Sequence, residues 1–320
     1  PVWTGYVNGY GHGWNNGVQP FARVTASDLW AQMSRRTMKA LTVEEQLYDN
    51  PALYFPLNDS AGSTTAGDQS DYARQALAVG QVGSGGSVLF GQTSSLGADP
   101  DEPCVVLTRS DASNGYYLTQ SYNPLPELAA VTGVTLECYV YLPVAVSGTV
   151  RLLELSHPSS ATILAVDLAA NVPVATITLG STVTATHGAA INDGAWHHVA
   201  AWYNGTSLRV YVDGSATTSA AALGTLTATV LSVGGTNTGT TLANAWVSGV
   251  AAYGSALAAA RITAHAAGVT GATGDTSLAR FNRIARLALG TWAESTSTET
   301  PAATMCGLPM VGQTSTSLIQ

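Results

Sequence analysis

The sequence is short of charge. Asp, Glu, Lys and Arg make up 10% of the 320 residues, against about 25% in ordinary globular domains. Ala, Thr, Ser and Gly fill the difference, so we expect a surface that is polar but largely uncharged. The 12 basic residues are scattered and the formal net charge is -8. This balance excludes nucleic acid as a partner, because phosphate binding needs clustered Lys and Arg.

The sequence also lacks several other features. Its cysteines, Cys104, Cys138 and Cys306, form no C-x-x-C pair and no zinc spacing. We expect three small buried thiols, although a Cys104–Cys138 bridge between neighbouring strands stays open. No run of 18 apolar residues predicts a membrane span, and no signal peptide is visible. The chain opens at Pro1 rather than Met, and we therefore expect a fragment, a processed product or a piece of a larger polypeptide.

The most informative segment is 193–215, DGAWHHVAAWYNGTSLRVYVDGS. Two runs of alternating residues meet at Asn204-Gly205, and the second run ends at Asp213-Gly214. Asn-Gly and Asp-Gly supply the positive φ angles that tight hairpin turns require. The segment therefore predicts an antiparallel meander with one buried face.

Similar patterns recur along the middle of the chain. Strands are predicted at 103–108, 115–119, 132–142, 149–155, 162–167, 173–178, 181–187, 195–203, 207–212, 224–234 and 244–253. This spacing, with turn signals between the strands, is typical of a β-sandwich. Helices are predicted after Ser27, over 43–48, over 255–267 and from Thr276 to about Gly290.

Four blocks carry a family resemblance. They are 51–59 (PALYFPLND), 133–141 (GVTLECYVY), the WHHV segment from Trp196 with the VYVDG that follows it, and 246–268. In this order they resemble the laminin-G-like (concanavalin A-like) jelly-roll family. The resemblance implies a mainly β fold, a concanavalin A-like antiparallel β-sandwich over 51–269, which binds sugars or proteins more often than it catalyses.

The flanks resemble a narrower group. WTGYVNGY and ARVTASDLWAQMSRR before the module, and DTSLARFNRIARLALGTW and GQTSTSLIQ after it, are similar to segments of minor tail proteins of phages infecting actinobacteria. The resemblance implies that 1–50 and 270–320 form a small α/β tail-assembly domain around the jelly roll. It also implies a place in the virion, other phage tail proteins as partners, and a homo-oligomer, with a trimer by analogy.

Aromatic residues are the candidates for ligand binding, because sugar sites need an aromatic platform with polar groups around it. Tyr139, Tyr141, Trp202 and Tyr211 alternate with predicted core residues, so we predict that they face the ligand side of the sheet. The alternative is that they fill the core between layers. Trp196 and Trp246 are predicted to be core residues.

Loop carboxylates are the candidates for a metal. Asp59, Asp167 and Asp193 would supply oxygen ligands for Ca²⁺, and the alternative is that they are surface turn residues. The family often has an acidic residue near the position of Ser248-Gly249, and its loss here weakens the calcium hypothesis. No other cofactor is expected.

Catalytic patterns are missing from the sequence. No E-x-D-x-E strand and no G-x-S-x-G elbow occurs, and Glu154 has no acidic neighbour on its own strand. We therefore expect no enzymatic activity. The leading hypothesis is a structural phage minor tail protein, of the tail tip or baseplate, that adheres to a host-surface glycan. The alternatives are a secreted bacterial adhesin or carbohydrate-binding module, and a divergent glycosidase with two carboxylates about 5–10 Å apart.

Overall fold

A computed structural model of the chain describes residues 6–15, 19–27, 40–97, 102–111, 113–143, 147–157 and 162–270. The chain divides into two compact units, 1–44 with 273–320, and 45–272. In the first unit, strands β1 (Tyr6–Asn15) and β2 (Gln19–Ser27) form an antiparallel hairpin. The helices predicted after Ser27 and from Thr276 lie outside the described residues. The tail-assembly role of 1–50 and 270–320 stays a prediction.

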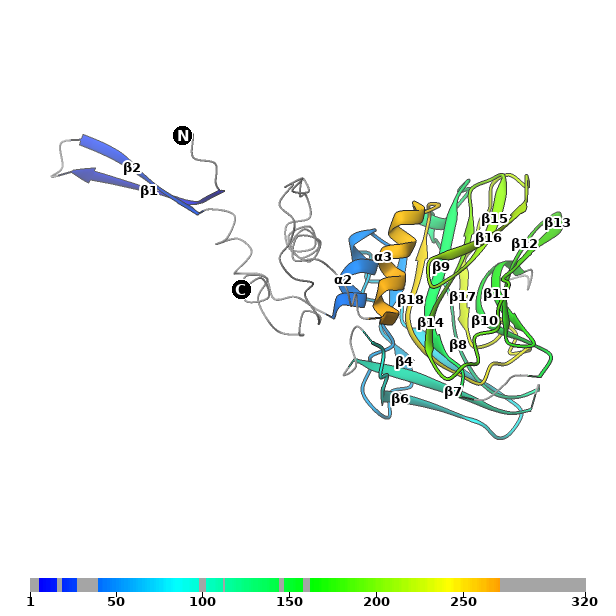
Figure 1. The fold of residues 1–320 in the computed structure, drawn as a ribbon. Helices are drawn as coiled ribbons and strands as arrows, with labels where there is room; N and C mark the ends of the chain where they lie inside the picture. Colours follow the sequence, from blue (N-terminus) through cyan, green and yellow to red (C-terminus); the bar gives the residue numbers. More distant parts are fainter. Residues whose placement is uncertain are drawn as a thin grey trace, which may run out of the picture. The chain divides into compact units, whose positions relative to one another are not determined.

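The second unit is an antiparallel β-sandwich, as predicted, and the described residues contain 16 strands of it (Figure 1). The first layer holds β3 (Leu53–Phe55), β6 (Ser87–Thr93), β7 (Pro103–Asp111), β9 (Val134–Tyr141), β14 (Trp196–Tyr203), β15 (Ser207–Val212), β16 (Ser215–Ala220) and β18 (Ala245–Tyr253). The second holds β4 (Thr65–Ala66), β5 (Leu77–Val82), β8 (Asn114–Ser121), β10 (Thr149–Ser156), β11 (Thr162–Ala169), β12 (Val172–Leu179), β13 (Ser181–Thr186) and β17 (Val230–Val233). Strand β7 pairs with β6 and β18 and also with β8, and so joins the two layers.

The turn signals of the central meander are confirmed. Asp213 and Gly214 have φ angles of 50° and 81°, which is the left-handed pair that a two-residue hairpin turn needs. Gly205 has φ 90°, and the Asn204 side chain accepts the N–H groups of Thr206 and Ser207. The turns therefore fix the register of β14, β15 and β16.

Some predicted bounds differ from the structure. The strand predicted over 224–234 is limited to Val230–Val233. Helix α3 spans Ala259–Thr270 rather than 255–267. The reason is Thr135, whose hydroxyl donates to the Ser255 carbonyl and accepts the N–H of Leu257, which holds this stretch against β9. Helix α2 (Leu41–Tyr48) agrees with the predicted helix over 43–48.

The core lies between the two layers. Alternate residues of β9 enter it, and these are Val134, Leu136, Cys138 and Val140. Cys104 lies instead in a separate cluster with Leu96, Tyr139 and Trp196. Both thiols are free, and burial raises the pKa of Cys104 to about 12. A bridge does not form because β18 lies between the strands that carry the two cysteines.

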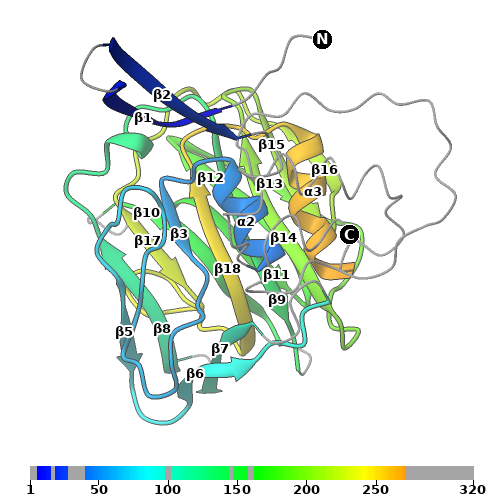
Figure 2. The same ribbon diagram turned by 90° about the vertical axis from the view of Figure 1, so that its left-hand side faces the viewer.

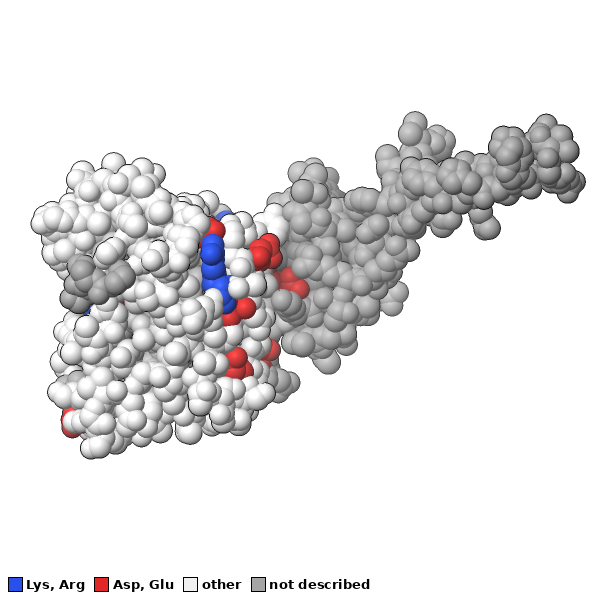
Figure 3. All heavy atoms as spheres, turned by 180° about the vertical axis from the view of Figure 1, so that it is seen from behind, with Lys and Arg blue, Asp and Glu red and all other residues white. Residues whose placement is uncertain are grey.

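The outer face of the first layer is covered in its middle by α3 and by the end of α2 (Figure 2). This face is therefore also buried there, and it carries polar side chains such as Glu137 and His198 with no exposed surface. The sandwich surface has few charged side chains on the face that Figure 3 shows. That agrees with the low charge of the sequence.

Candidate functional site

The register of strands β9, β14 and β18 positions the residues of the candidate site. Tyr141 of β9 lies opposite Trp196 of β14 on one side and opposite Trp246 of β18 on the other. Paired residues point to the same face of a sheet, so the three rings form a row across the outer face. The next row along the strands holds Ser248, Tyr139 and His198.

In the aromatic row (Trp246, Tyr141 and Trp196), the ring of Tyr141 contacts both tryptophan rings. The Tyr141 ring centroid is 6.0 Å from that of Trp196, at an interplanar angle of 37°. It is 5.8 Å from that of Trp246, at 72°. Both separations lie within the range of about 4.5–7 Å that favours aromatic pairs. The row lines a hollow with a volume of about 700 Å³, within the range of about 300–1,000 Å³ for small-molecule sites.

The walls of the hollow come from the segment 94–97 and from the end of α3. The Trp196 indole N–H donates to the Ser94 carbonyl, which ties this segment to β14. A Cβ atom at Gly97 would overlap the carbonyl oxygen of Val269, so only glycine lets the segment approach α3 this closely. Val269 and Thr270 form the helical wall.

The hollow retains polar groups without partners. Among the described residues, neither the Tyr141 hydroxyl nor the Trp246 indole N–H takes part in a hydrogen bond. The lining residues that the structure describes include no charged side chain. Aromatic faces with a few unpaired donors suit a ligand that combines apolar C–H surface with hydroxyl groups.

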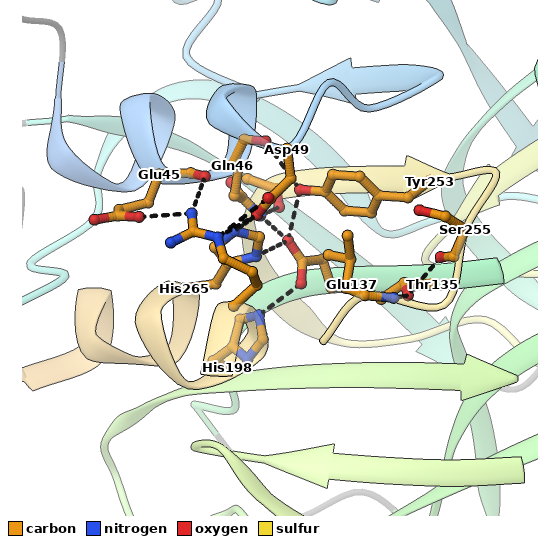
Figure 4. A network of polar contacts seen from close by, with 12 residues as sticks. Glu45, Gln46, Asp49, Thr135, Glu137, His198, Tyr253, Ser255 and His265 are labelled. Atoms are coloured by element: carbon orange, nitrogen blue, oxygen red, sulfur yellow. Dashed lines mark hydrogen bonds and ion pairs between the residues drawn. The ribbon is translucent and has the colours of Figure 1, made fainter. Parts of the chain in front are cut away.

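Next to the aromatic row lies a buried charge network centred on Glu137 (Figure 4). One carboxylate oxygen of Glu137 accepts hydrogen bonds from Gln46 Nε2 at 2.9 Å and from the Tyr253 hydroxyl at 3.0 Å. The other lies 3.2 Å from His198 Nε2. Gln46 Nε2 also donates to the carbonyl of Gly249, a residue with φ 58° in the bulge of β18.

His265 of α3 sits between two carboxylates in this network. Its Nδ1 lies 2.9 Å from Glu137 Oε1, and its Nε2 lies 2.9 Å from Asp49 Oδ2. Burial alone would lower the pKa of His265, but the charges and hydrogen bonds of Glu137 and Asp49 outweigh it and raise this pKa from 6.5 to about 9. Burial alone would raise the pKa of Glu137, but His265 and His198 hold it well below 4.5. His265 is thus a cation at neutral pH.

Arg261 extends the network to α2. Its guanidinium lies 2.8 Å from Asp49 Oδ2 and 2.8 Å from Glu45 Oε2. The ion pairs of Arg261 and His265 together hold α3 and the end of α2 on the outer face of β9. The network therefore fixes the position of the helix that walls the hollow.

The network also contains the one group of three metal-type ligands among the described residues. The ligand atoms of Glu137, His198 and His265 lie within 4.8 Å of one another. A metal ion there would have to displace the proton that Glu137 and Asp49 hold on His265. We therefore interpret the group as a structural ion-pair network.

The four predicted ligand residues lie in three places. Tyr141 lines the hollow. Tyr139 is fully buried, and its hydroxyl donates to the His265 carbonyl at 2.7 Å. The Trp202 indole N–H donates to the Leu257 carbonyl at 2.9 Å. The Arg209 guanidinium carbon lies over the Trp202 ring, 4.4 Å from its centroid. That guanidinium also donates to the Tyr211 hydroxyl at 3.1 Å. The ligand roles of these residues stay predictions.

The sequence analysis places Trp196 and Trp246 in the core. This is confirmed for Trp196, which is buried in the cluster with Leu96, Cys104 and Tyr139, whereas Trp246 is half-buried and packs against that cluster. Both also line the hollow, which the sequence analysis does not predict. Their common signal is a tryptophan at or next to the first position of a strand, and only the register of β9, β14 and β18 shows that they meet.

The three predicted calcium ligands are each held by a different partner. Asp59 Oδ1 accepts the Gly67 N–H at 3.0 Å. Asp167 receives two hydrogen bonds from Arg151, at 2.8 and 3.0 Å. Asp193 lies 3.0 Å from His197 Nε2. The structure does not gather them into one group.

Glu154 has an acidic neighbour that the strand pattern did not reveal. Arg151 forms ion pairs with both Glu154 and Asp167, which come from neighbouring strands of the second layer. Both carboxylates are buried and share one guanidinium.

The comparisons agree with this fold. Residues 111–263 match the family model of the concanavalin A-like lectin/glucanases superfamily. The match agrees with the concanavalin A-like fold that the laminin-G-like resemblance predicts and that the sandwich shows. A search of the curated proteins finds no match. No helix among the described residues is long and apolar enough to cross a membrane.

Several solved structures share the fold. One concerns botulinum neurotoxin type C, whose cell entry depends on interaction with two ganglioside molecules (14% identity, TM-score 0.51). Two others are the binding domain of botulinum neurotoxin DC, in complex with rat synaptotagmin II (15%, 0.52) and with SialylT (14%, 0.52). Each match covers 72% of this chain and 54% of the other, so this chain spans about half the length of those proteins.

Proposed function

We propose that the chain is an adhesion protein that binds a surface glycan in the hollow beside the aromatic row. The observation that carries this proposal is the row itself. Its three rings lie at the edge of a lectin-type sandwich, with two donors that have no partner among the residues described. Aromatic rings bind the C–H face of a sugar, and nearby donors pair with its hydroxyls.

The solved structures lend support to a carbohydrate-binding role. Two of them involve gangliosides or SialylT. Their ligand contacts are not transferred to this chain, because the match spans about half of those proteins at low identity.

The proposed action is binding without bond cleavage. Glycosidases need a carboxylic acid and a carboxylate free to act on the bond. Glu154 and Asp167 are instead held by Arg151, and Glu137 lies inside the buried network. These observations favour a binding role.

We further propose that the protein is a phage minor tail protein located in the virion. The support is the resemblance of the flanking segments 1–50 and 270–320 to those of tail proteins. In this role it would bind other tail proteins. It would also form a homo-oligomer of its own copies, a trimer by analogy.

A glycan array, with and without Ca²⁺, tests the adhesion role. The full chain should bind at least one surface glycan, and Trp246→Ala should remove that binding. Tyr72→Ala is the control, because Tyr72 is 39% exposed and does not line the hollow. Absence of binding to any glycan would contradict the proposal.

Electron microscopy tests the virion role. An antibody against the chain should label one end of purified phage tails. Label on bacterial surfaces or in the medium would instead favour a secreted adhesin or carbohydrate-binding module.

A further inference from the structure

We infer that the hollow takes an uncharged hexopyranose and rejects acidic sugars such as sialic and uronic acids. This inference rests on the proposed glycan adhesion and names the chemical class of its ligand. It separates this chain from what the SialylT complex of its structural neighbour would suggest.

The lining of the hollow is the first reason. A sugar carboxylate needs a cation or several directed N–H groups to replace its hydration, because burying it unpaired is costly. The described lining residues include neither Arg, Lys nor His. The Trp196 N–H, which would be a further donor, is already bonded to the Ser94 carbonyl.

The arginines of the second unit are the second reason, since none is free to turn toward the hollow. Each of the five has a partner elsewhere: Arg74 with Glu127, Arg109 with the Leu242 carbonyl, Arg151 with Asp167, Arg209 with Tyr211, and Arg261 with Asp49. Moving one of them would leave a carboxylate, a backbone carbonyl or an aromatic side chain without its partner.

The neighbouring sequence adds no cation. The stretches that directly continue from the lining residues, 98–101 (ADPD), 144–146 (VAV) and 271–279 (GATGDTSLA), contain no Lys or Arg. The whole chain has a formal net charge of -8, which repels anionic ligands at a distance.

The groups that the hollow does offer suit a neutral sugar. The rings of the aromatic row present apolar surface to the C–H face of a hexopyranose. The Tyr141 hydroxyl can donate to or accept from a sugar hydroxyl, and the Trp246 N–H can donate. These contacts need no charge on the ligand.

Matched pairs of sugars test this inference by calorimetry on the full chain. The pairs are glucose with glucuronic acid, in which a carboxylate replaces the hydroxymethyl group, and lactose with 3′-sialyllactose, which carries one additional sialic acid residue. The neutral member of at least one pair should bind about tenfold or more tightly than its acidic partner, the size of one charged hydrogen bond that the hollow cannot make. Trp246→Ala should lower the affinity for the neutral sugar at least tenfold, and Tyr72→Ala should leave this affinity unchanged.

The outcomes separate the two proposals. Equal or tighter binding of the acidic member would overturn the inference and leave glycan adhesion standing. If the Trp246→Ala variant unfolds at the same temperature as the parent protein and still binds the neutral sugar, the hollow is not the binding site. Failure of every sugar here and on the array would overturn glycan adhesion itself.

Discussion

The outer face of the first layer has a closed region and an open region, and the same three strands build both. In the closed region Glu137 has four side chains around one carboxylate, under α3 and the end of α2. In the open region, four residues along β9, the Tyr141 hydroxyl lies beside two tryptophans and has no hydrogen-bond partner in the described part of the chain. Polar groups thus serve stability where helices cover them, and we propose that they serve recognition where the face is open.

Removing the central charge of the closed region should have the largest effect. Glu137→Gln leaves His265 buried as a cation with Asp49 as its only carboxylate partner. Breaking a buried ion pair on one side costs about 3–5 kcal/mol, so the unfolding midpoint in urea should fall accordingly.

Glu127→Gln is the matched control for this variant. Its partner Arg74 lies 2.6 Å away, but the two side chains are 19% and 23% exposed. A pair near the surface contributes about 1 kcal/mol or less. Equal losses in the two variants would contradict the contrast between the regions.

Alkaline pH should weaken the closed region next. The pKa of His265 is raised from 6.5 to about 9. Its contribution to the free energy of unfolding is therefore complete below pH 6.5 and is lost as the pH rises through 9. The shift corresponds to about 3 kcal/mol. Urea unfolding between pH 6 and 10 should show the loss, and an NMR titration that puts the pKa of His265 near 6.5 would refute it.

The smallest expected effect distinguishes two tyrosines on one strand. Tyr141→Phe should weaken glycan binding by about 0.5–1.5 kcal/mol, the value of one hydrogen bond, and leave stability unchanged. Tyr139→Phe removes the buried bond to the His265 carbonyl, so it should cost stability by a similar amount and leave binding unchanged. The reverse result, measured by calorimetry and urea unfolding, would break the comparison.

The sandwich was predictable because its strands follow local rules. Val134, Leu136, Cys138 and Val140 alternate along the predicted strand 132–142 and lie in the core, and the Asp213-Gly214 dipeptide marks a turn. Strand β16 was missed, because its sequence SATTSA has no apolar alternation and most of it is exposed.

The site was much less predictable, because its residues meet through long-range pairing. Trp246 and Trp196 meet through Tyr141 on the strand between them, and a single strand pattern cannot tell a core tryptophan from one that lines a hollow. Glu137 and His265 lie 128 positions apart in the numbering and meet only after α3 docks. Sequence patterns therefore identified the faces of the strands but not the partners across them.

Helix α3 is shared by both regions, and this has a thermodynamic consequence. His265 anchors it in the charge network, and Val269, one turn further on, walls the hollow. A ligand that needs this wall binds only while the helix is docked. Above the dissociation constant, each tenfold increase in the concentration of such a ligand would stabilise the docked helix by about 1.4 kcal/mol more. Reciprocally, undocking of the helix would release the ligand.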